Sequence, residues 1–201
     1  MWWIDLDKLQ CEMASLTSER HPSAAIDPSA TIDERQGAVI IGARTKICGG
    51  ATIIGPVRIG EDCLVGNLAM IRGPARIGDG IRIGFATEIK NVILDNDVAI
   101  GPQCFVADSV VGCRAYLGAQ VRTSNHRLDR RTVSVMVHDL LIDTGRDKLG
   151  SHIGADASIG IQAIILPGRS VAAGSTIGPR VTVEKNLPTG RYRLAQQLVS
   201  Y

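Results

Sequence analysis

A six-residue hydrophobic period runs through most of this chain and constrains its fold more than any other feature. From Ile41 the period places Ile or Val at positions 47, 53, 59, 65, 71, 77, 83 and 89, and it resumes from Ile153 to Val183. An amphipathic helix needs apolar spacings of three and four, and a half-buried strand alternates by two. A chain that turns a corner every six residues explains the period, because Gly and Asp after the apolar residue suit turns.

Three such faces make a coil of about 18 residues, with Ile and Val stacked inside a triangular prism. Aromatic residues make up only 3% of the chain, which suits a narrow core of small and β-branched side chains. The sequence therefore predicts an all-β fold, a parallel β-helix of hexapeptide repeats. A β-sandwich with frequent turns is the alternative, and the many phased hexads count against it. Right-handed crossovers are the general rule, and the period alone does not fix the hand.

The pattern divides the chain into three expected parts. Residues 3–20 have helical apolar spacing, so we expect residues 1–25 to form a helical cap that plugs the first coil. Residues 26–188 form the β-helix, and residues 123–150 abandon the hexad and must leave the prism as a loop or hairpin. Residues 189–201 form a tail, a helix or strand that could cross onto a neighbouring subunit. A polar loop of this length on a rigid scaffold indicates function.

Composition excludes several classes of partner. The net charge is +2, from 22 basic and 20 acidic residues spread along the chain, so nucleic acid is not an expected partner. The five cysteines form no CxxC pair and are odd in number, which fits reduced thiols. The first residues carry no apolar run of signal or membrane length. We therefore expect a cytoplasmic protein without a membrane partner.

Four segments carry a resemblance to a known family: IRGPARIGDGIRIGFATEIKN, VADSVVG, SNHRLDRRTV and DTGRDKLGSHIGADASIGIQAIILPG. With the hexads they resemble the left-handed β-helix acyltransferases, and more specifically the acetyltransferase half of bifunctional sugar-1-phosphate nucleotidyltransferase and amino-sugar-phosphate acetyltransferase enzymes. No Gly-rich loop of the nucleotidyltransferase half precedes the prism, so we expect a stand-alone relative. The resemblance implies a left-handed coil, acetyl-CoA as acyl donor, and a homotrimer with its sites between subunits.

The resemblance also implies site residues. The family's phosphate-holding Arg and Lys fall on Arg72 and Lys90, and its loop Asn falls on Asn125. A second Lys of the family, later in its sequence, is replaced in this chain by Arg131, which is also a cation. Arg72 and Lys90 could equally be residues of a solvated prism face.

Three positions depart from the family's pattern. The position of the family's general base is occupied by Pro102, which cannot accept a proton. Phe105 replaces a Tyr of the family, and Tyr116 replaces another of its Asn residues. Either the chain uses another base and acceptor, or it has lost the reaction.

His126 is the candidate replacement base. Its string Ser-Asn-His-Arg-Leu-Asp resembles a motif of the galactoside and maltose acetyltransferases, where a loop His before x-Leu-Asp is the base. An imidazole titrates close to neutral pH and can take the proton that the acceptor loses. The alternative is that His126 is simply a polar loop residue. His138, in a predicted strand of the loop, and His152 are weaker candidates.

Two other features bear on ligands. Arg180 and Lys185, near the last coils, could meet the phosphates of CoA. We expect no metal: γ-type carbonic anhydrases of this fold need three imidazoles converging on one ion. The four histidines here lie in the leader and around the loop instead.

These observations predict a CoA-dependent acyltransferase, specifically an acetyltransferase, acting on an amino sugar, sugar phosphate or nucleotide sugar, with a loop His as general base. The alternative is a non-catalytic trimeric scaffold or a regulatory, ligand-binding protein descended from such an enzyme. A third possibility is a cleft turned to another reaction on a small anion.

Overall fold

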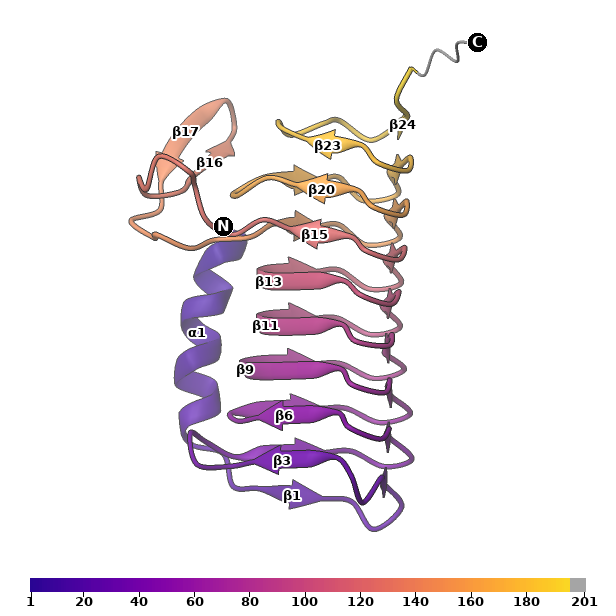
Figure 1. Ribbon diagram of the computed structural model, residues 1–201. Helices are drawn as coiled ribbons and strands as arrows, with labels where there is room; N and C mark the ends of the chain where they lie inside the picture. The colour runs from indigo at the N-terminus through magenta and orange to yellow at the C-terminus, as the bar shows by residue number, and fades with distance from the viewer. Residues whose placement is uncertain (196–201) are drawn as a thin grey trace, which may run out of the picture.

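The computed structural model describes residues 1–195 and shows a tall three-sided prism with one helix along its flank (Figure 1). Parallel strands stack coil upon coil, and the nine-stranded sheet contributes one strand to each coil. The predicted fold is confirmed: a left-handed parallel β-helix of hexapeptide repeats, with a short N-terminal helix and an extruded loop.

Two sheets build the prism and a hairpin projects from it. The nine-stranded sheet contains β2 (Ala25–Ile26), β5 (Lys46–Ile47), β8 (Leu64–Val65), β10 (Arg82–Ile83), β12 (Ala99–Ile100), β14 (Tyr116–Leu117), β19 (Ser158–Ile159), β22 (Thr176–Ile177) and β24 (Arg191–Tyr192). The 13-stranded sheet contains β1 (Glu19–Arg20), β3 (Thr31–Asp33), β4 (Val39–Ile41), β6 (Thr52–Ile54), β7 (Val57–Ile59), β9 (Met70–Ile77), β11 (Glu88–Leu94), β13 (Phe105–Val111), β15 (Arg122–Thr123), β18 (His152–Ile153), β20 (Ile164–Ile165), β21 (Ser170–Val171) and β23 (Thr182–Val183). The hairpin is β16 (Ser134–Val137) with β17 (Leu140–Asp143).

The larger sheet covers two faces of the prism because its long strands bend around a corner. The first half of β9 pairs with β6, and the second half pairs with β7. The register between β9 and β11 shifts between Lys90 and Val92, which places a bulge at the corner. We call the face that continues through β6 and β15 the groove face, and the face that continues through β7 and β18 the helix face.

The hexad residues fill the prism. The inward side chains of the central coils are almost completely buried, among them Ile47, Ile53, Ile59, Ile71, Ile77, Ile83 and Ile89. They form one continuous core from Val39 to Val183. Because every third of a coil contributes one such side chain, the period of six seen in the sequence is the spacing of the prism's three inner faces.

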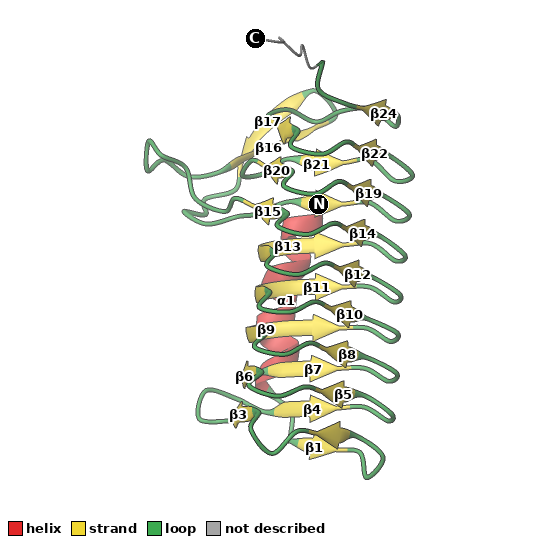
Figure 2. Cartoon of the chain, turned by 45° about the vertical axis from the view of Figure 1, so that its right-hand side comes forward, coloured by secondary structure: helices red, strands yellow, loops and turns green. Residues whose placement is uncertain are grey.

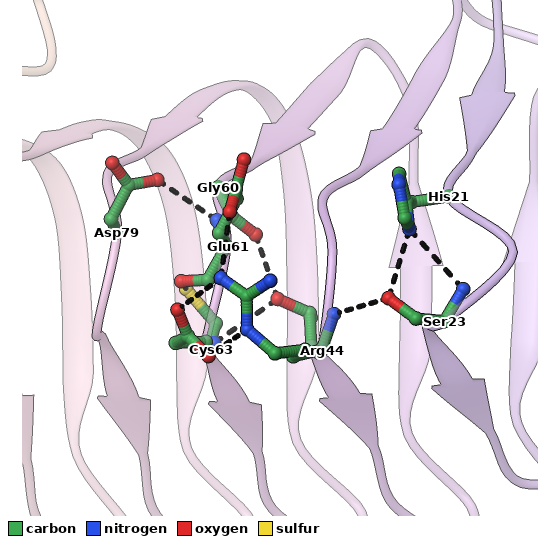
Figure 3. Close-up of polar contacts among 9 residues, drawn as sticks. His21, Ser23, Arg44, Gly60, Glu61, Cys63 and Asp79 are labelled. Atoms are coloured by element: carbon green, nitrogen blue, oxygen red, sulfur yellow. Dashed lines mark hydrogen bonds and ion pairs between the residues drawn. The ribbon is translucent and has the colours of Figure 1, made fainter.

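Turns between the helix face and the nine-stranded sheet stack as a ladder of polar contacts (Figure 3). Arg44 donates from Nε to Asp62 Oδ1 at 2.7 Å and also pairs with Glu61, while Asp79 Oδ1 accepts the Glu61 N–H at 2.8 Å. The Arg44 guanidinium lowers the pKa of Asp62. These groups are exposed, so their ion pairs add little stability. This corner therefore orders turns and lies away from the groove face.

The N-terminal helix does not plug the first coil, and that expectation is wrong. Helix α1 (Trp2–Ala14) runs beside the prism and packs on β9, β11 and β13 (Figure 1). Its buried side chains Trp3, Leu6, Leu9 and Met13 join Ile93 of the helix face in a second hydrophobic cluster. Outward-facing Ile93 and half-buried Val110 give the helix an apolar surface to cover.

The chain leaves the prism after β15 and rejoins it at β18, and the hairpin stands out from the coils (Figure 2). Val133, Val135 and Leu149 of this segment pack in the α1 cluster. Arg146 pairs with Asp7 of the helix, so helix and loop support each other. His138 lies at positive φ in the hairpin turn, not in a strand as predicted.

The structure describes only part of the expected tail. Of the expected tail, Arg191–Tyr192 form β24, which pairs with β22; residues 196–201 lie outside the described part. Among the described residues, no helix is long and apolar enough to cross a membrane.

Candidate functional site

A groove of about 500 Å³ opens on the groove face beside the point where the loop leaves the prism. Strands β9, β11 and β13 form its floor, and the two ends of the extruded loop form its wall. The lining side chains are Arg72, Lys90, Phe105, Asn125, His126 and Lys148. Five of these six residues are ones that the sequence singled out, from segments up to about 50 positions apart.

The parallel register explains why the two floor cations meet. Lys90 pairs laterally with Arg72 on one side and with Ala107 on the other, so Arg72 and Lys90 occupy the same column on successive coils. Residues in one column of a parallel sheet project from the same face. The groove therefore has two cations on adjacent coils, and the next position of the column, Ala107, is buried.

The groove carries excess positive charge. Arg72 pairs with Glu88, which neutralises one cation, while the Nε of Arg72 is buried without a hydrogen-bond partner. Within residues 1–195, Lys90 and Lys148 form no ion pair. Unpaired cations in a partly enclosed groove favour an anionic ligand such as a phosphate or carboxylate.

His126 stands at the neck of the loop. Its backbone forms an antiparallel bridge with Lys148, and the Leu149 N–H donates to the carbonyl of Asn125 at 2.9 Å. These contacts fix the backbone of His126 while its side chain remains exposed at the groove. Within the described residues no hydrogen bond involves the His126 imidazole, so both ring nitrogens are available to a ligand.

A buried carboxylate under the loop neck is a site residue that the sequence did not reveal. Asp108 is only 4% exposed, and its Oδ2 lies 2.6 Å from Asn125 Nδ2. Its Oδ1 lies 2.6 Å from Asn91 Nδ2. The spacing of 17 residues among Asn91, Asp108 and Asn125 was a possible signal, because it equals one coil at this height of the prism.

Lys148 and Glu88 also escaped the sequence analysis. Lys148 reaches the groove only because the loop returns antiparallel to its own start, a pairing that no repeat predicts. Glu88 is next to Arg72 because β9 and β11 pair in register. In the sequence, nothing distinguishes Lys148 or Glu88 from an ordinary exposed charged residue.

Other residues predicted for the site lie elsewhere on the chain. Arg131 is exposed in the loop and its N–H donates to Asp129, whose pKa is lowered by Arg127. Tyr116 is on β14 of the nine-stranded sheet, a different face from the groove. Pro102, the family's base position, lies in the turn before β13 and does not line the groove.

The two residues expected to meet CoA phosphates lie near the top of the prism. Arg180 occupies a turn at positive φ, with its N–H donating to the carbonyl of Ile161, and its side chain is exposed. Lys185 is exposed just after β23. Both lie on coils beyond the groove, and neither lines it.

His152 lies under α1 rather than in the groove. Its ring stacks on Trp2 with centroids 6.0 Å apart. Burial lowers the pKa of His152 below its ordinary value, with the N-terminal amine acting in the same direction and Asp95 opposing it. The neutral ring is therefore the form that the packed helix favours.

This burial predicts that acid weakens the docking of α1. Because the folded-state pKa of His152 is depressed, the unfolded chain binds the extra proton first, and stability falls as pH drops below about 6.5. We expect the melting temperature to fall between pH 8 and pH 5.5, and to fall less in His152→Gln. His138→Gln, in an exposed turn, is the matched control and should behave as wild type. An equal acid response in His152→Gln would contradict this role.

Within residues 1–195, no group of three or more His, Cys, Asp or Glu side chains is placed to hold a metal ion.

Comparison with known proteins identifies relatives over most of the chain. No protein-family model matches it. The uncharacterized acetyltransferase YaiX of Escherichia coli is 58% identical in strain K12 over 168 residues, which are 84% of this chain and 73% of that protein. In strain 536 / UPEC the same protein is 54% identical over the same shares.

More distant relatives are larger enzymes. The bifunctional sugar-1-phosphate nucleotidylyltransferase/acetyltransferase of Sulfurisphaera tokodaii is 32% identical over 55% of this chain and 28% of its own length. Among solved structures, the UDP-N-acetylglucosamine acyltransferase of Campylobacter jejuni is 16% identical, covers 84% of this chain and 72% of its own, and superposes with a TM-score of 0.39.

Proposed function

This chain belongs to the hexapeptide-repeat acetyltransferases, and on that premise we propose that it transfers an acetyl group from acetyl-CoA to an amino sugar, sugar phosphate or nucleotide sugar. The observation that supports this most is the groove, which gathers three cations, an asparagine and a histidine at the loop neck. The larger relative's name includes both a sugar phosphate and acetyl transfer.

The residues of the groove suit distinct parts of this reaction. Arg72, Lys90 and Lys148 would hold the acceptor's phosphate or carboxylate, because charge-assisted hydrogen bonds are strong in a partly enclosed groove. A ring nitrogen of His126 would take the proton that the acceptor's hydroxyl or ammonium group loses on attack. Phe105 would give the acceptor an apolar wall.

The acyl donor would bind beside the acceptor and extend over the coils above the groove. When bound, acetyl-CoA supplies a thioester whose acyl carbon is attacked while the CoA thiol leaves. Arg180 and Lys185, on those coils, would hold the phosphates of CoA. A main-chain N–H group facing the acyl carbon would donate a hydrogen bond to the oxygen that becomes negative.

A homotrimer with its sites at the subunit seams completes the proposal. The groove is open on one side, and exposed apolar side chains lie along the corner that borders the groove face, including Leu68, Met70, Phe85, Ile161 and Ile164. Apolar surface of this kind favours contact with another subunit. Sedimentation equilibrium should give a mass of three chains, and a monomer at working concentration would contradict this arrangement.

Binding of CoA is the first test of the function. A ligand that binds only the folded state raises the free energy of unfolding by about 2.7 kcal/mol at a hundredfold excess over its Kd. We expect CoA and acetyl-CoA to raise the melting temperature, by about 5–11 °C at that excess for a chain of this size. No shift with either ligand would contradict the proposal.

Two single variants test where CoA binds. Arg180→Ala should reduce the shift if this side chain meets a CoA phosphate, whereas Arg82→Ala is the control, because Arg82 is exposed on the nine-stranded sheet. Mass spectrometry of acetyl-CoA incubated with a panel of amino-sugar phosphates then identifies the acceptor.

Two departures from the family's pattern favour a second function. By the resemblance, Pro102 stands where the family has its base and Phe105 where it has a tyrosine, which suits a protein that binds a sugar nucleotide without acetylating it. Such a trimeric scaffold or regulatory protein would be stabilised by nucleotide sugars and not by CoA. The same thermal measurement separates the two functions.

A further inference from the structure

A second cavity, which we call the helix cavity, lies beside α1 at the corner where the groove face meets the helix face. Its volume is about 410 Å³, within the range of pockets that hold small ligands. One side of α1, the corner of β9, β11 and β13, and the end of the extruded loop line it. Among the lining residues are Leu6, Asp7, Gln10, Pro74, Asn91 and Arg146.

Lys90 connects the helix cavity with the groove, because its side chain lines both. It is on β11, directly before Asn91 at the corner bulge, so it stands at the edge between the two hollows. A ligand that contacts Lys90 in the groove can therefore extend around the corner toward α1.

The side of α1 that lines the helix cavity is not the side that packs on the prism. Asp7, Gln10 and Cys11 are three and four residues apart, which places them on one side of a helix. All three are exposed, whereas Leu9 and Met13 are buried in the cluster that attaches α1 to the prism. Packing of the helix therefore does not explain which side chains line the cavity.

Charges balance in the helix cavity, in contrast to the groove. The cavity is lined by two carboxylates, Asp7 and Asp108, and by two cations, Lys90 and Arg146. Asp7 pairs with Arg146, and Asp108 accepts hydrogen bonds from two asparagine amides. The charged groups of the cavity are thus largely satisfied by one another, so an uncharged ligand fits it better than a second anion.

The groups left over in the helix cavity suit a ring that carries hydroxyl groups. Within residues 1–195, the Gln10 amide has no hydrogen-bond partner, and Asn91 donates from Nδ2 while its Oδ1 accepts nothing. An amide both donates and accepts, as a hydroxyl group does. Leu6 and Pro74 add apolar surface. Among the lining residues, all in the described part of the chain, none is aromatic, and a nucleobase would need such a side chain to stack on.

We propose that the helix cavity binds a second, uncharged sugar ring of the acceptor, whose phosphate is held in the groove. The proposal rests on the proposed function and deepens it, because the acceptor is then a sugar phosphate of at least two rings. Gln10 hydrogen-bonds hydroxyl groups of this ring through both ends of its amide, and Asn91 accepts one at Oδ1. Gln10 is thus a specificity-determining residue supplied by α1.

Calorimetry with glucose 1-phosphate, maltose 1-phosphate and cellobiose 1-phosphate tests the second ring. We expect one of the disaccharide phosphates to bind at least about tenfold more tightly than glucose 1-phosphate, as one or two added hydrogen bonds allow. Gln10→Ala should remove most of this advantage and leave the binding of glucose 1-phosphate unchanged. Lys8→Ala is the matched control, because Lys8 is exposed on the same helix and does not line the cavity. Alanine favours the helix at both positions, so both variants should fold.

Alkylation of Cys11 shows where the ring binds. Cys11 lines the helix cavity and is exposed, whereas the other four cysteines are buried or half-buried. With iodoacetamide and peptide mass spectrometry, the tighter disaccharide phosphate should slow the alkylation of Cys11 in proportion to its occupancy. Glucose 1-phosphate should leave that rate unchanged. Cys113, in the turn between β13 and β14, is the internal reference and should react at the same rate throughout.

Two results would overturn the assignment of the helix cavity. One is that neither disaccharide phosphate binds more tightly than glucose 1-phosphate, and the other is that the tighter ligand leaves Cys11 as reactive as in the free protein. The CoA measurement is independent, because these binding assays contain no CoA. Failure of the disaccharide assays beside a normal CoA shift would overturn only the second ring, and absence of the CoA shift alone would contradict the proposed acetyl transfer.

Discussion

Replacing His126 with alanine should lower the turnover number by about two to four decades, because general-base catalysis contributes that much to a transfer in which the acceptor loses a proton. The imidazole is exposed at the groove and has no protein partner within residues 1–195, so its removal leaves no buried polar group unsatisfied. Stability and the KM for acetyl-CoA should change little. The rate should be measured with the acceptor that the panel identifies.

His138→Ala is the control for this variant. His138 is also exposed on the extruded loop but lies in the hairpin turn, away from the groove, so its turnover should equal that of wild type. A loss of less than tenfold in His126→Ala would remove the residue from the base role.

Gly150→Ala should produce the largest loss of stability among single-methyl additions at the site. A Cβ at this position would lie 2.0 Å from the carbonyl oxygen of Ala107 and 2.2 Å from the hydroxyl of Ser109. The returning loop would have to separate from β13 and lose the hydrogen bond from Gly150 N to Asp108. We expect a loss of about 4 kcal/mol in the free energy of unfolding, or about 8–16 °C in melting temperature.

Gly145→Ala is the matched control on the same loop. Gly145 has φ of 68° and open space where its Cβ would be, so the substitution adds only the strain of a left-handed backbone, about 1–2 kcal/mol. Thermal unfolding of both variants distinguishes close packing at the loop base from ordinary backbone strain. Equal losses in the two variants would show that the prism accommodates the extra methyl group.

The loop base also links these two predictions. Gly150 and Asn125 contact Asp108 from opposite ends of the loop, so a displaced return should disturb the Asn125 amide and, next to it, His126. Gly150→Ala should therefore lose activity at temperatures where it remains folded, whereas Gly145→Ala should not. Circular dichroism at the assay temperature verifies that the comparison is between folded proteins.

The sequence by itself determined the prism, because an apolar residue at every sixth position has no other simple structural solution. Ile71, Ile77, Ile83 and Ile89 are each buried to within 2%, as a stacked interior requires. The same period showed where it breaks, and therefore where a segment leaves the prism. The hand of the coil came from the family resemblance and not from the spacing. The resemblance also identified the candidate site residues Arg72, Lys90, Asn125 and His126.

Only the tertiary structure decided where α1 packs and what supports the loop. The run Val92, Ile93 and Leu94 is buried throughout, since its inward residues face the core and Ile93 faces the helix. A hexad pattern records the inner face of each strand and carries no information on what covers the outer one. Asp108 is buried under the loop neck against Asn125, and Lys148 reaches the groove because the loop returns antiparallel to its own start. Such contacts depend on backbone geometry between distant residues, which a local repeat does not specify.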